Sequence, residues 1–185
     1  TNIVWAHLFL HQDIIYAMGV SKVYGDLVIR QSTDNGLTWT QAKDDKSGLL
    51  RNDLEYHTAP VPMVTHKGRI YRAVEVRNPG YGWGFNFEAL LISAPIDSDL
   101  LQAENWVVSN RLHFDQRWLG TAWLEGNVVV TPEDKLVNIL RVHYQEHGGK
   151  VAKVHYDVAL TFLPLGRWGM RHLLRWEPLL AVHKG

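Results

Sequence analysis

Short apolar, β-branched runs recur along most of the chain, and Gly, Pro, Asn and Asp separate them. Three segments, beginning near residues 3, 59 and 126, repeat one plan: an apolar run, a tight turn and a second apolar run. Runs bounded by such turn residues are typical of β-strands, and a recurring plan is typical of repeat architectures. The pattern therefore predicts an all-β protein built from three similar units.

Each unit is expected to contribute three strands, with Tyr16, Tyr71 and Val137 at matching places in the second strand. The expected strands are 3–10, 14–20, 25–31, 59–65, 69–76, 87–93, 126–131, 135–144 and 151–158. Some runs, such as 128–130, are apolar at every position, which predicts strands covered on both faces by neighbouring sheets. Residues 163–185 leave this plan, and a short helix, a divergent strand and an irregular terminus are all open there.

The third strand of the first unit leads into a turn that reads Ser32-x-Asp34-x-Gly36-x-Thr38-Trp39. Ser and Asp side chains at such positions bond nearby backbone N–H groups, and glycine adopts positive φ at little cost. The tryptophan offers a large apolar plate, so the segment predicts a self-bonded turn that is anchored in a core. A degenerate copy spans 93–99 and is followed by Trp106.

This motif, complete at every specified position, resembles the Asp box (BNR repeat) of the sialidase-like β-propellers. The resemblance covers about residues 3 to 158 and implies one all-β domain, 1–185, with about three four-stranded antiparallel blades. The implied blades are 1–50, 56–110 and 122–158, followed by an atypical tail, 159–185. Propellers of this family usually have about six blades, so the chain is expected to be a fragment or to self-associate through open blade edges. The resemblance also implies that the Asp box is structural and lies away from the chemistry.

Charge and composition exclude several functions. Lys+Arg and Asp+Glu both number 19, so nothing indicates binding to nucleic acid or to an anionic membrane. Cysteine is absent and no stretch is apolar enough to span a membrane. The pairs His7/His11 and His143/His147 have metal-like spacing only on a helix, whereas strands are expected there, so neither a metal nor a cofactor is predicted. The residues leave the compartment open, and the resemblance alone implies a secreted or periplasmic location.

Because consecutive strands run antiparallel, the position of a candidate residue in its strand determines the end of the blade at which it lies. The starts of innermost strands and the ends of second strands share one end of the blades, and the Asp box lies at the other. The shared end is expected to collect carboxylates, arginines, histidines and aromatic rings: Asp53, Glu55, His57, Glu75, Arg77, Tyr81, Trp83, Asp115, Glu125, Asn127, Arg141 and His143. Two carboxyl groups can cleave a glycosidic bond, and arginine can clamp an acidic sugar.

The predicted function is therefore a glycoside hydrolase that acts on a sugar. An acidic sugar would suit the arginines at this end of the blades. Glu125 is assigned the acid/base role and Glu75, expected to meet Arg141, a stabilising role; Asp53 and Asp115 are reserve acids. The expected substrate contacts are Arg77, Arg141, His57, Asn127, Trp83 and Tyr81. Structural readings stay open: an ion pair between Glu75 and Arg141, a hydrogen-bonding role for His57, and an aromatic loop that only caps the core.

Two other functions stay open. One is a non-catalytic propeller that binds glycan or protein, and the weaker one is a polysaccharide lyase with a His or Tyr base. The Phe/Tyr-Arg-Ile-Pro motif that supplies the first arginine of sialidases is not found in this sequence. The resemblance therefore implies the fold of the family more strongly than a sialic acid substrate.

Overall fold

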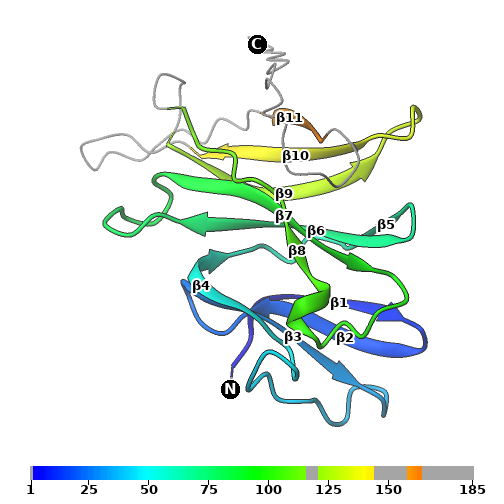
Figure 1. Ribbon diagram of the computed structural model, residues 1–185. Coiled ribbons are helices and arrows are strands. Elements are labelled where there is room, and N and C mark those ends of the chain that lie inside the picture. The colour runs from blue at the N-terminus through cyan, green and yellow to red at the C-terminus, as the bar shows by residue number, and fades with distance from the viewer. Residues whose placement is uncertain (1, 116–120, 144–157, 164–185) are drawn as a thin grey trace.

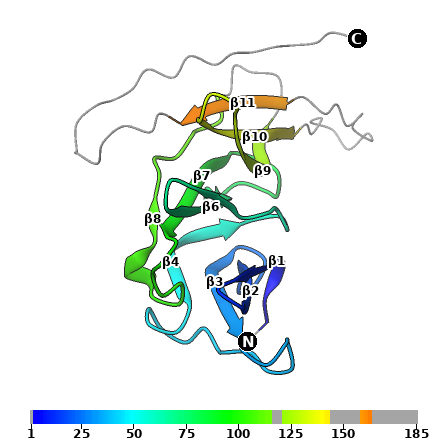
Figure 2. The ribbon, with the colours of Figure 1, turned by 90° about the vertical axis from the view of Figure 1, so that its right-hand side faces the viewer.

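The computed structural model describes residues 2–115, 121–143 and 158–163 of the 185-residue chain. These residues form antiparallel sheets stacked one above another in the order of the sequence (Figures 1 and 2). Each blade is a meander of antiparallel strands, and the stack is that of consecutive propeller blades. The predicted fold, a partial β-propeller, is confirmed. Among the described residues, no helix is long and apolar enough to cross a membrane.

Blade one contains β1 (Val4–His11), β2 (Ile14–Val20) and β3 (Gly25–Ser32), each close to its predicted range. Its fourth strand, β4 (Leu49–His57), pairs with β3 through Leu49 and Arg51. The last three residues of β4 then pair with β6 of the next blade. One strand thus closes blade one and opens blade two, which the apolar pattern did not predict because the middle of β4 is polar.

Blade two contains β5 (Val64–His66), β6 (Arg69–Arg77), β7 (Phe87–Pro95) and β8 (Val107–Val108), with a short 3₁₀ turn, η1 (Ala103–Asn105), before β8. Blade three contains β9 (Ala122–Val130), β10 (Leu136–His143) and β11 (Val158–Leu163). β11 holds the place predicted for 151–158, so the expected tail boundary at 159 falls inside a strand. Residues 151–157 and the rest of the tail, 164–185, lie outside the described residues.

The two long strands of blade two, β6 and β7, are buried on both faces. In β6, Val74 and Val76 pack in the core shared with blade one, while Tyr71 and Ala73 face Val128 and Leu136 of blade three. Because side chains alternate across a strand, a strand between two sheets is apolar at consecutive positions. The predicted cover on both faces is therefore correct for β6. It is wrong for the run 128–130, because Val130 ends β9 and is exposed.

The Asp box forms a turn bonded within itself. Asp34 accepts the Thr38 amide at 2.8 Å, the Thr38 hydroxyl at 2.5 Å and the Ser32 hydroxyl at 2.7 Å. Ser32 accepts the Gly36 amide at 2.8 Å, and the Trp39 indole donates to the Gly36 carbonyl at 3.1 Å. Trp39 is only half-buried and lies over its own turn, so its predicted role as a core anchor is wrong. In the degenerate copy, by contrast, Trp106 is buried and belongs to the core.

Candidate functional site

Strand register brings the predicted site residues to one end of the blades. Residues 55–57 of β4 pair with 75–77 of β6, and Tyr56 also pairs with Gly25 at the start of β3. The Asp box follows the other end of β3, so it lies at the opposite end of blade one. In blade three, the start of β9 pairs with the end of β10, through Ala122 and His143.

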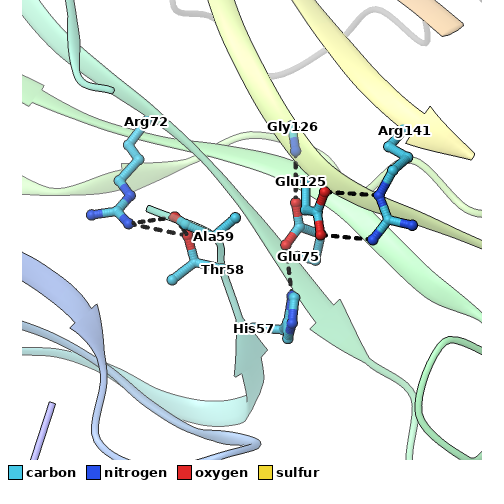
Figure 3. Close-up of polar contacts among 8 residues, drawn as sticks. All are labelled: His57, Thr58, Ala59, Arg72, Glu75, Glu125, Gly126 and Arg141. Carbon is cyan, nitrogen blue, oxygen red and sulfur yellow. Dashed lines mark hydrogen bonds and ion pairs between the residues drawn. The ribbon is translucent and has the colours of Figure 1, made fainter. Parts of the chain in front are cut away.

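A carboxylate and a guanidinium form a two-point ion pair in blade three. Arg141 donates from Nε and Nη2 to the two carboxylate oxygens of Glu125, at 2.8 and 2.7 Å (Figure 3). Glu125 lies in a β-bulge: it and Gly126 together face Leu140, between the pairs Leu124–Arg141 and Asn127–Ile139. The predicted contact between Glu75 and Arg141 is therefore wrong, because the bulge turns Glu125 onto this arginine instead.

His143 and Trp83 extend the cluster. Arg141 Nη1 lies 3.2 Å from His143 Nδ1, and because arginine can only donate, this nitrogen accepts and the imidazole is neutral. Burial lowers the pKa of His143, the Arg141 charge lowers it further, and Glu125 opposes both. The Trp83 ring meets the imidazole edge-on, 5.0 Å between centroids. Trp83 is 46% exposed and Tyr81 50%, so this loop carries aromatic side chains at the surface.

The second predicted glutamate, Glu75 on β6, lies in the core with 1% of its surface exposed. One carboxylate oxygen accepts the Gly126 backbone N–H at 3.0 Å, and the other lies 2.9 Å from His57 Nδ1 (Figure 3). The His57 ring is buried between Trp5 and Phe87, with centroids at 4.5 and 5.3 Å. For His57 the structural reading fits these contacts, and neither residue faces solvent in this arrangement.

Arg77 is engaged on three sides. Its guanidinium lies 3.1 Å from Glu55, donates to the Tyr81 carbonyl at 3.0 Å and stands over the Tyr24 ring at 4.2 Å. These contacts join β6 to the end of β4 and to the aromatic loop. Arg77 therefore holds the loop that carries Tyr81 and Trp83, which is a different task from the predicted clamp on a substrate.

The two reserve acids differ in their surroundings. Asp53 accepts two hydrogen bonds from Arg51, at 3.0 and 2.5 Å, and one from the Tyr56 hydroxyl. The Arg51 hydrogen bonds are the main reason that the pKa of Asp53 is lowered. Asp115 is half-buried beyond Phe114, directly before residues 116–120, which lie outside the described part of the chain.

Asn127, a predicted substrate contact, follows the bulge on β9. Its side-chain oxygen is buried and has no hydrogen-bond partner within the described ranges. Thr121, just before β9, donates to the Gly84 carbonyl at 2.6 Å and so ties the aromatic loop to blade three.

Two features of this end were missed by sequence reasoning. The first is Gly126, which a glycine inside an apolar strand could have revealed as a bulge. The second is a cluster around buried Glu88, which contacts His113 at 2.6 Å, Asn78 at 2.8 Å and Arg111 at 3.3 Å. Sequence reasoning overlooked Glu88, although a single carboxylate in an otherwise apolar strand indicates a buried charge that needs partners. Across the described residues, no group of three or more metal-ligating side chains is assembled.

Neither a family model nor a curated protein matches this sequence. Solved structures do match. The α-L-arabinofuranosidase from Lactobacillus brevis superposes with a TM-score of 0.52 at 11% identity, over 88% of this chain and 52% of its own. The xylan β-1,4-xylosidase from Bacillus halodurans C-125 gives 0.51 at 12% identity, over 88% of this chain and 29% of its own.

This chain thus spans about half the length of the first enzyme and less than a third of the second. A Trypanosoma rangeli sialidase superposes more loosely, with a TM-score of 0.46 at 11% identity, over 96% of this chain and 30% of its own. At such low identity the first two likenesses define the fold, which is a propeller-like fold found in glycoside hydrolases.

Proposed function

We propose that the chain is part of a glycoside hydrolase of the sialidase-like, Asp-box superfamily, and that its sugar binds where Glu125 and Arg141 meet. The observation that carries the proposal is one contact cluster of Glu125, Arg141, His143 and Trp83. It joins a carboxylate, a guanidinium, an imidazole and an exposed aromatic ring at the end of the blades opposite the Asp box. The fold shared with an arabinofuranosidase and a xylosidase supports it.

In this cluster Glu125 suits a different role from the predicted acid. A carboxylate that accepts two hydrogen bonds from arginine can accept a proton or stabilise positive charge, but it has no proton to donate. Glycoside cleavage passes through an oxocarbenium-like transition state, beside which a carboxylate is stabilising. We therefore assign Glu125 the base or charge-stabilising role.

Arg141 and the aromatic loop would hold the sugar. The three hydrogen bonds to Glu125 and His143 use three of the five N–H donors of the guanidinium, so two remain for a substrate carboxylate. Trp83 and Tyr81 supply exposed rings for stacking on the sugar. This arrangement favours an acidic sugar among the possible substrates.

The proton donor must come from elsewhere. Asp53 is a poor candidate because its bonds from Arg51 and Tyr56 favour the ionised form and its pKa is lowered. We therefore assign the role of proton donor to Asp115, the predicted acid on the connection between blades two and three.

A second candidate function is glycan binding without turnover. It is favoured by one observation: Glu125 is paired with an arginine and Glu75 is buried, so neither predicted catalytic glutamate presents a proton to solvent. In this case the rings and Arg141 would bind the sugar and no bond would be cleaved.

Hydrolysis of aryl α-L-arabinofuranosides, β-xylosides and α-sialosides tests the proposal. We expect Glu125→Gln to lower the rate by roughly 10²–10⁴-fold and Asp115→Asn to do so most with poor leaving groups. Glu104→Gln, an exposed acid in η1, is the matched control and should keep full activity. Sugar-dependent shifts of the Trp83 indole signal without product would favour the binding function. A wild-type chain that neither cleaves nor binds these sugars would refute both.

A further inference from the structure

The Glu75 carboxylate joins three strands inside the molecule. It projects from β6, contacts His57 on β4 and accepts the backbone N–H of Gly126 on β9 (Figure 3). We propose that Glu75 is a positioning residue: it locks the β9 bulge that presents Glu125 to Arg141, and it does not itself touch the substrate. The inference rests on the proposed function only in treating Glu125 as the working carboxylate.

The β9 bulge has a backbone conformation that its surroundings must stabilise. Glu125 has a φ of 54°, a left-handed conformation that non-glycine residues seldom adopt and that persists only where its surroundings enforce it. Neither Glu125 nor Gly126 has a partner of its own in the register with β10. An external acceptor for the Gly126 N–H is therefore what holds this conformation, and Glu75 supplies it.

Gly126 brings the backbone within reach of that acceptor. A side chain here would place its Cβ 2.8 Å from Ala73 Cβ and 2.8 Å from Asn138 Oδ1, which is too close for any residue but glycine. The β9 backbone thus packs directly on β6, two residues from Glu75. Close packing sets where the bulge lies, and the hydrogen bond sets which way its N–H points.

The other carboxylate oxygen fixes Glu75 itself. It is held at 2.9 Å from His57 Nδ1, and the imidazole is packed between Trp5 and Phe87. With both oxygens occupied, the carboxylate cannot turn toward solvent while this packing is maintained. Glu75 therefore transmits the position of blades one and two to the bulge in blade three.

The NMR signal of the Arg141 Nε–H, which donates to Glu125, reports the bulge without any substrate. Glu75→Gln can keep both contacts, because its amide oxygen accepts from Gly126 and its NH₂ donates to His57 Nδ1 when the imidazole carries its proton on Nε2. Glu75→Leu keeps the size of the side chain and removes both. We expect the signal to persist in Glu75→Gln and to exchange with water at least about tenfold faster in Glu75→Leu, as expected for a lost hydrogen bond. The Arg77 Nε–H, bonded to the Tyr81 carbonyl, is the internal control and should not change.

An unchanged Arg141 signal in Glu75→Leu, or its loss in a folded Glu75→Gln variant, would overturn the proposal. If Glu75→Leu does not fold, Glu75→Asp decides instead, because one methylene fewer withdraws the carboxylate from Gly126, and the same faster exchange is expected. On a glycoside that the wild type cleaves, Glu75→Gln should stay within about tenfold of wild type, whereas a catalytic carboxylate would lose roughly 10²–10⁴-fold, and such a loss would also overturn it. The NMR result stands even if no glycoside is cleaved, so a failure of the proposed function remains distinguishable.

Discussion

At the scale of single residues, the polar side chains at the site end form separate sets. Glu125, Arg141 and His143 bond to one another near the surface, whereas Glu75 and His57 bond to each other in the core. The separation matters because solvent, and hence a ligand, can reach the first set but not the second. Under the proposed function, a substitution in the first set should thus change ligand contacts directly, and one in the second should act through the backbone.

His143 provides a test of this surface set. Its pKa is lowered by burial and then by Arg141, so the folded protein binds a proton less readily than the unfolded chain, whose histidine has a pKa near 6.5. Between these two pKa values the unfolded state holds more protons, so stability rises with pH through that window and falls as pH drops below about 6.5. We expect the imidazole signals of His143 to titrate below 6.5 by NMR.

The same effect should appear when the wild type and His143→Gln are compared by urea unfolding from pH 5 to 8. Replacing His143 by Gln removes the titrating group, so His143→Gln should lose less stability than wild type as the pH falls. Equal pH dependence in both proteins would mean that burial and the Arg141 charge do not lower the pKa of His143. Comparing the two proteins cancels the contributions of the other histidines.

At the scale of elements, the Asp box ends β3 by hydrogen bonds within one turn. Hydrogen bonds from the Thr38 hydroxyl and amide, then from Ser32, lower the pKa of Asp34 to about 2. The folded state therefore favours the ionised carboxylate, and its stabilising effect, complete above the unfolded value near 3.8, is lost as the pH falls toward 2.

Asp34→Ala should lower the thermal midpoint at pH 7 and should differ less from wild type at pH 2.5. Asp45→Ala, at an exposed position in the following loop, is the control and should leave both midpoints unchanged. A midpoint for Asp34→Ala equal to that of wild type at pH 7 would remove the structural role of the box.

The β9 bulge is the second element with a sharp requirement. Gly126→Ala would force Cβ against Ala73 and Asn138, and overpacking of this kind costs about 1–3 kcal/mol in the free energy of unfolding. Gly82→Ala is the matched control, because its Cβ would find its nearest neighbour, Phe85, at an ordinary 3.7 Å. Urea denaturation of both variants measures the difference. Equal stability would mean that β9 can move away from β6 freely.

These elements also show what the sequence could predict. The strands β2 and β6 were predicted almost to the residue, because Tyr16 and Tyr71 lie in apolar runs with clear turns before them. The end of the blades at which the candidate residues gather followed from antiparallel geometry alone. The side-chain contacts at that end could not be predicted in the same way. The side chain that meets Arg141 depends on a one-residue bulge, which reverses a side-chain direction.

At the scale of the whole molecule, buried polar contacts join the blades. Arg72 of blade two is buried against blade one, where it donates to the Met18 carbonyl at 2.5 Å, and it also bonds the Ala59 carbonyl at 2.9 Å. Burial lowers the pKa of Arg72 to about 10, and the Glu75 charge opposes that shift. At the Asp-box end, Asp134 of blade three forms an ion pair with Lys67 at 2.5 Å, and its carboxylate lies 3.5 Å from His66 Nε2. Hydrophobic packing between the sheets and these polar contacts together hold the blades in place.

The same stack leaves apolar side chains exposed on its first strand. Leu8 is 59% exposed and Leu10 is 70% exposed, and as alternate residues of β1 they point to the same side. In a closed propeller such side chains would have a neighbour, and exposed apolar edges favour association. We therefore predict that the chain self-associates through β1.

Sedimentation velocity across a concentration series should show a rising average mass for the wild type, and Leu8→Lys with Leu10→Lys should shift it toward monomer. Leu37→Lys, at a fully solvated leucine of the Asp-box turn that is 85% exposed, should not change the association. A wild type that sediments as a monomer at every concentration would show that these leucines do not mediate contact between copies.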